Sequence, residues 1–71
     1  MLSLSDILEL KKEIKSQFEV QLHFHDVCPK PYFTIENSDE AVEEFISKFL
    51  ESRNYYPKFS DNHLQFTVEK L

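Results

Sequence analysis

Apolar residues recur at steps of three and four over the first 18 positions. This spacing places them on one side of a helix, while charged residues fill the other sides. The stripe consists of Ile7, Leu10, Ile14 and Phe18. Ser3 with Asp6, or Ser5 alone, can cap the start of this helix by accepting backbone N–H groups of the first turn. The pattern predicts a helix over Leu4–Phe18.

The hydrophobic period changes to two after this helix. In residues 19–26, Val20, Leu22 and Phe24 alternate with His23 and His25, which is typical of a half-buried strand. Residues 32–36 repeat the alternation, with Phe33 and Ile35 on the apolar side. Between them lie Cys28, Pro29, Lys30 and Pro31, and proline cannot donate to a strand ladder. We therefore expect a hairpin with a stiff loop.

A second amphipathic helix should follow the hairpin. Asn37 is a favoured N-cap residue, and Glu40 three positions later completes a variant of the capping box. The apolar stripe of this helix comprises Ala41, Val42, Phe45, Ile46, Phe49 and Leu50. Acids lie in its first two turns and bases in its last, as the helix dipole favours.

The last third of the chain predicts two more strands. Pro57 limits residues 55–59 to an edge strand or a loop. Residues 60–62 have the composition of a turn, in which Asn62 can take the positive φ that glycine usually supplies. Residues 63–69 then alternate, with Leu64, Phe66 and Val68 directed inward.

The predicted order is α-β-β-α-β-β in a single domain over residues 1–71. Two helices packed on one face of a small, mainly antiparallel sheet would bury every apolar stripe, which defines an α+β fold. The helix between the second and third strands can serve as a right-handed crossover.

Charge and composition exclude several function classes. The chain has 13 acidic and 8 basic residues and a net charge of −5, which argues against nucleic-acid binding. Lys11, Lys12 and Lys15 are expected on a solvated helix face, in ion pairs with Glu9 and Glu13. Glycine is absent, which excludes the P-loop and the dinucleotide fingerprint.

The single cysteine, Cys28, excludes a disulfide within the chain and favours a reducing compartment. The first residues lack the pattern of a signal peptide, and no apolar run has the length of a membrane span. We therefore expect a cytoplasmic protein without a membrane partner.

Metal-ligating side chains gather near the end of the first strand. His23 and His25 are two positions apart and point the same way, so they can converge on one ion with Cys28, Asp26 or the distant His63 as the third ligand. Imidazole and thiolate are zinc ligands, although the paired spacing of a structural zinc site is missing. The competing interpretation is that both histidines lie on a solvated sheet face.

Cys28 with His25 is also a candidate nucleophile pair. A catalytic cysteine needs an oxyanion hole and a cleft, and neither is evident in the sequence. We therefore favour an inert thiol, no catalytic residues and no required cofactor.

The polar side of the predicted sheet is a candidate partner surface. It would carry Gln21, His23, His25, Tyr32, Thr34, Gln65 and Thr67. Two further segments are candidates. The acidic residues 36–44 could bind a basic partner, although the helix dipole also explains them. The aromatic residues Tyr55, Tyr56 and Phe59 could stack on a ligand or lie in a core.

The segment His25-Asp26-Val27-Cys28, followed by Tyr32-Phe33, resembles the RDAC family of short bacterial proteins of unknown function. That family is named for an Arg-Asp-Ala-Cys tetrapeptide, of which Asp26 and Cys28 match and the other two positions differ. The resemblance implies that Asp26 and Cys28 matter, and it implies no activity.

The leading hypothesis is a protein-interaction module without catalytic activity, bound to a protein partner or to a second copy. The first alternative is a metal-binding protein that uses His23, His25 and Cys28. The second is an acidic inhibitor or nucleic-acid mimic that binds a basic partner.

Overall fold

A computed structural model describes residues 2–27 and 30–71 and confirms the α+β class with the order α-β-β-α-β-β. The two helices are α1 (Leu4–Phe18) and α2 (Glu40–Glu51). The four strands are β1 (Leu22–His25), β2 (Tyr32–Ile35), β3 (Tyr55–Phe59) and β4 (Gln65–Lys70). The predicted bounds of α1 agree with the structure, whereas β1 is shorter than residues 19–26.

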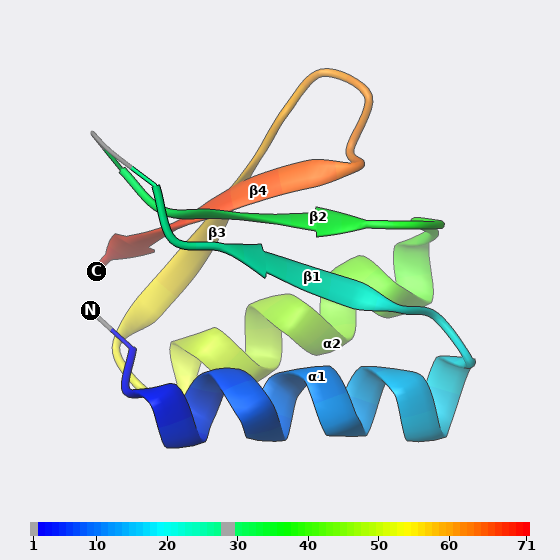
Figure 1. The fold of residues 1–71 in the computed structure, drawn as a ribbon, viewed down its shortest axis with the longest axis horizontal. Helices are drawn as coiled ribbons and strands as arrows, with labels where there is room; N and C mark the ends of the chain where they lie inside the picture. Colours follow the sequence, from blue (N-terminus) through cyan, green and yellow to red (C-terminus); the bar gives the residue numbers. More distant parts are fainter. Residues whose placement is uncertain (1, 28–29) are drawn as a thin grey trace.

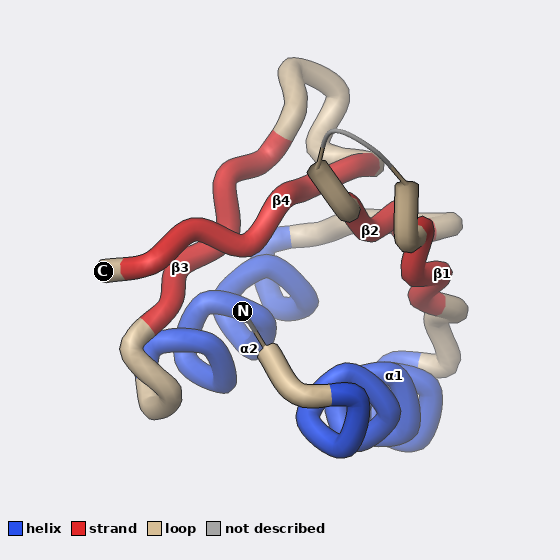
Figure 2. Tube along the Cα trace, turned by 60° about the vertical axis from the view of Figure 1, so that its left-hand side comes forward, coloured by secondary structure: helices blue, strands red, loops and turns tan. Residues whose placement is uncertain are grey.

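The strands form one antiparallel sheet in the order β1-β2-β4-β3, and both helices lie on the same side of it (Figure 1). β1 and β2 form the predicted hairpin. α2 then carries the chain across the sheet to β3 at the far edge, and β4 returns to fill the place between β3 and β2. A view turned by 60° shows α1 beneath β1 and α2 beneath the other half of the sheet (Figure 2).

The core is one apolar layer between the helices and the sheet. Leu10 and Ile14 from α1, Ile46 and Leu50 from α2, and Phe66 from β4 are each at most 1 % exposed. The Phe33 and Phe66 rings stack with centroids 4.9 Å apart, which links β2 to β4 through their side chains as well as their ladder.

Arg53, just after α2, joins the two helices. Its Nε donates to Asp6 Oδ1 at 3.0 Å and its Nη2 to Glu9 Oε2 at 3.1 Å, while its guanidinium lies over the Phe49 ring. The hydrogen bond from Arg53, with a second from Ser3, holds the pKa of Asp6 below its usual 3.8.

The predicted ion pairs of Lys11, Lys12 and Lys15 with Glu9 and Glu13 are wrong. Glu9 is paired with Arg53, and Glu13 Oε2 instead accepts a hydrogen bond of 2.8 Å from Gln17 Nε2. Over residues 2–27 and 30–71, none of the three lysines forms an ion pair. The long-range contact with Arg53 could not be anticipated from helical spacing.

The start of α2 also differs from the prediction. The N-cap is Asp39, not Asn37, and its Oδ1 accepts the Val42 N–H at 2.9 Å from an extended backbone. Glu40 is therefore the first helical residue, and Ala41 is exposed. Val42, Ile46 and Leu50 are the buried residues of the predicted stripe.

In the turn before β4, the residue with positive φ differs from the one that the sequence suggested. Asn62 does not take the positive φ, which falls on His63 at 59°. The Asn62 side chain instead accepts hydrogen bonds from the Leu64 N–H and the Ser60 hydroxyl. Leu64 is therefore part of the turn and 39 % exposed, not directed into the core. β3 is an edge strand, as Pro57 indicated.

The cap assignment predicts the effect of two substitutions. Asp39→Ala should lower the free energy of unfolding by about 1 kcal/mol, because the Val42 N–H loses its acceptor. Asn37→Ala is the matched control and should change it by less than about 0.5 kcal/mol, because Asn37 is exposed outside the helix. Urea unfolding followed by circular dichroism measures both; a larger loss for Asn37→Ala would refute the assignment.

The burial of α1 residues predicts the effects of a second pair of substitutions on stability. Leu10→Ala should cost about 2–5 kcal/mol, since it leaves a cavity at a fully buried position. Leu8→Ala, at a position 56 % exposed in the same helix, should be nearly neutral. The midpoint of urea unfolding compares them, and equal effects would contradict this helix orientation.

Candidate interaction surfaces

The sheet face opposite the helices carries most of the predicted partner surface. Because Leu22, Phe33 and Phe66 are buried against the helices, the residues between them point to the other face. The strand register pairs His23 with Thr34, and Thr34 with Gln65, across this open face. Its predicted members from the strands are His23, His25, Tyr32, Thr34, Gln65 and Thr67. Gln21 precedes β1 and is exposed.

His25 is held in place by its two neighbours on the open face. Its Nε2 lies 2.9 Å from Thr34 Oγ1, and its ring stacks on Tyr32 with centroids 4.6 Å apart. All three side chains are half-buried. The result is a pre-ordered polar and aromatic patch beside the outermost strand.

His63 lies apart from the other two histidines. Its Nδ1 is 3.0 Å from Glu43 Oε1 of α2, and its ring stacks on Phe59. Leu64 O accepts the N–H of Ile35, at the end of β2, whereas His25 pairs with Tyr32 at its start. The two sites are thus at opposite ends of a strand.

No group of three or more metal-ligating side chains occurs in residues 2–27 and 30–71. Cys28 lies outside the described residues. The zinc hypothesis therefore stays a prediction, and it would depend on His23 and His25 with Cys28, without His63. The same holds for the hypothesis that Cys28 is reactive.

The acidic stretch serves the local structure of α2. Asp39 caps the helix, and Glu43 accepts from Ser38 Oγ at 2.9 Å in addition to contacting His63. Glu44 pairs with Lys48 at 2.9 Å, which lowers the pKa of Glu44. Among the aromatic candidates, Tyr55 and Phe59 pack against the core and Tyr56 is 43 % exposed.

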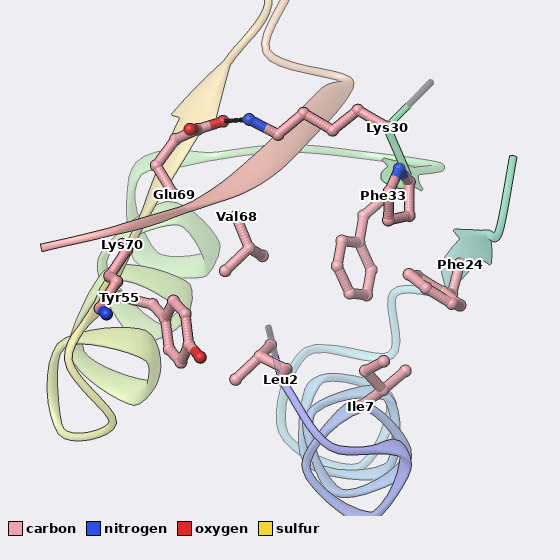
Figure 3. Close-up of a pocket in the computed structure, with 10 residues that line it drawn as sticks. Leu2, Ile7, Phe24, Lys30, Phe33, Tyr55, Val68, Glu69 and Lys70 are labelled. Carbon is pink, nitrogen blue, oxygen red and sulfur yellow. Dashed lines mark hydrogen bonds and ion pairs between the residues drawn. The ribbon is translucent and has the colours of Figure 1, made fainter. Parts of the chain in front are cut away.

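A cavity of about 290 Å³ opens between the start of α1 and the sheet (Figure 3). Apolar side chains of Leu2, Ile7, Phe24, Phe33, Tyr55 and Val68 line it. Lys30 and Glu69 form an ion pair at its rim. The lining is mainly apolar, so the cavity offers volume for an apolar group.

The backbone of β1 presents a complete row of hydrogen-bonding groups to its free side. Gln21 O accepts the Glu36 N–H at 3.2 Å, so the backbone groups of residues 21, 23 and 25 face β2. By alternation, the N–H and C=O groups of Leu22 and Phe24 face outward, where no further strand of residues 2–27 and 30–71 pairs with β1.

The other edge strand, β3, contains a proline that hinders pairing with a further strand. Ser60 N–H donates to Gln65 O and Leu71 N–H to Asn54 O, so the backbone groups of the even-numbered residues of β3 face β4. Pro57 therefore occupies an outward position in the middle of β3, where an N–H donor is missing. The neighbouring Lys58 is exposed, and both features are typical of an edge protected against pairing. β1 is the available edge.

The Lys30–Glu69 ion pair at the rim of the cavity predicts how the titration of Glu69 responds to substitution. Hydrogen bonds from Lys30 and then from Thr67 hold the pKa of Glu69 below its usual 4.5, so its stabilising contribution is lost as pH falls through the folded-state value. Lys30→Met should raise this pKa toward 4.5, and Lys58→Met should raise it less, since Lys58 acts only through space. Carboxyl ¹³C NMR titration measures both; an unchanged Glu69 pKa in Lys30→Met would contradict the pairing.

Comparison with known proteins finds no relatives. No family model, no curated protein and no solved structure matches the chain. The resemblance to the RDAC family stays a prediction. None of the helices described is long and apolar enough to cross a membrane.

Proposed function

We propose that this chain is a cytoplasmic protein-interaction module without catalytic activity, and that it binds an extended segment of a partner protein along β1. The observation that carries this proposal is the contrast between the two sheet edges. β1 has its outward backbone groups at Leu22 and Phe24, whereas Pro57 interrupts the corresponding row on β3.

Strand addition uses groups that every partner backbone possesses. The main-chain hydrogen bonds supply affinity, and alternate side chains of the added strand supply specificity. One set of these side chains would lie on the open face, beside His23 and His25. The other set would lie on the helix side, beside α1.

The order already present next to β1 supports this role. The hydrogen bond between His25 and Thr34 and the stacking of His25 on Tyr32 hold one of the β1 side chains that an added strand would meet. Because few side chains then need to be ordered on binding, less conformational entropy is lost. The cytoplasmic location is proposed because a lone cysteine suits a reducing compartment.

A neutral peptide tests the proposal without knowledge of the natural partner. Titration of the ¹⁵N-labelled protein with a seven-residue peptide of alternating threonine and valine should shift the amide signals of Leu22 and Phe24. It should also slow their hydrogen exchange, because both N–H groups gain an acceptor.

The matched control is the same peptide with two consecutive central residues N-methylated, which removes donors and obstructs pairing. It should leave Leu22 and Phe24 unchanged. Signals that move only at Gln65 and Thr67 would instead assign binding to the middle of the open face. Equal shifts with the methylated peptide would overturn strand addition.

A further inference from the structure

We infer that the segment bound by β1 is acidic, and that Lys11, Lys12 and Lys15 of α1 select it. This inference rests on the proposed function, because it names the chemistry of the strand that β1 would accept. The three lysines and the free edge belong to one surface.

The lysines lie directly beside the available edge. Together with Gln21 and Leu22 at the start of β1, they line an open hollow of about 410 Å³. α1 runs beneath β1 (Figure 1). The side of α1 away from the lysines is turned to α2, because Asp6 and Glu9 contact Arg53 there. An added strand would therefore have the three ammonium groups on its helix side.

These charges are not neutralised within the described residues. Glu9 and Glu13, the acids closest to them in α1, are engaged with Arg53 and Gln17. Lys12 and Lys15 are exposed and Lys11 is half-buried. Glu19 and Asp26 lie before and after β1, and neither forms an ion pair with these lysines. In a chain with a net charge of −5, this is a local basic surface.

The spacing of the lysines matches the spacing of a strand. Lys11 and Lys15 are four residues apart, which is about 6 Å along a helix. Alternate side chains on one face of a strand are about 6.6 Å apart. A partner segment with acids at alternate positions can therefore place successive carboxylates near Lys11 and Lys15, with Lys12 beside them.

Charge also argues against a second copy of this chain as the strand that pairs with β1. If β1 paired with β1 of another molecule about a two-fold axis, the two α1 helices would lie next to each other beneath the joined sheet. Their lysine sets would then meet, and like charges across an interface oppose association. The surface is complementary to an acidic strand from a different protein.

Three peptides of equal length test this inference on the full chain. Alternating glutamate and valine, threonine and valine, or lysine and valine differ in charge and keep the strand pattern. The glutamate peptide should bind tightest by fluorescence anisotropy at low salt, and the lysine peptide weakest. The advantage of the glutamate peptide should fall as salt is raised, since exposed ion pairs are screened.

Two variants with the same net charge separate a local effect from a global one. Lys11→Gln combined with Lys12→Gln and Lys15→Gln should weaken glutamate-peptide binding about tenfold, through the loss of three exposed ion pairs. The control combines Lys48→Gln, Lys58→Gln and Lys70→Gln, which lie on α2, β3 and β4. It should retain most of the affinity. Circular dichroism checks that both variants fold.

The outcomes distinguish this inference from the function on which it rests. If all three peptides shift Leu22 and Phe24 with equal affinity, strand addition stands and the acidic preference is overturned. Equal weakening in both triple variants would overturn the role of the α1 lysines. If no peptide affects β1, the proposed function itself fails. A dimer in sedimentation analysis with protected Leu22 and Phe24 amides would overturn the assignment to a foreign acidic strand.

Discussion

The insertion of the last strand between β2 and β3 is the contact on which the rest of the structure depends. β4 carries Phe66, which is 1 % exposed, stacks on Phe33 and also contacts the ring of Phe59. Without β4, the hairpin and β3 would share no ladder, and the helices would cover two separate pieces of sheet. A two-stranded hairpin alone is only marginally stable in water.

This arrangement also decides which surfaces remain available. With β4 and β2 in the centre, β1 and β3 become the edges. Both helices cover one face, so His25, Tyr32 and Thr34 are left on the other. Pro57 then lies on the outer side of β3, where it removes a donor without breaking a bond to β4. One edge is protected and the other is not.

The absence of glycine shapes the turns that connect these elements. Glu19, Asn54 and His63 all have positive φ, in the connections after α1, after α2 and before β4. A residue with a Cβ atom pays roughly 1 kcal/mol or more in this region, although asparagine is better tolerated than most. At His63 the same turn is accompanied by contacts of the ring with Phe59 and Glu43. The surrounding packing thus supports a backbone that the residue alone would disfavour.

The sequence by itself determined the helices, the strands and the inward side chains of most of them. Helical and strand periods depend on neighbours within a few residues, so Leu4–Phe18 and the alternation around Phe33 could be predicted. The N-cap of α2 was predicted at Asn37 but is Asp39, because both residue types form caps and local sequence does not separate them. The open face was predicted correctly, since alternation places His23 and Thr34 opposite the buried residues.

Only the tertiary structure decided the strand order, the free edge and the state of the lysines. The position of β4 follows from pairing between distant segments, about which local periodicity contains no information. Arg53 is 44 residues from Glu9, yet it takes the carboxylate that helical spacing assigned to the lysines. The separation of His63 from His25 depends on the same register. The candidate binding edge therefore arises from long-range packing, while the residues that form it were readable as local elements.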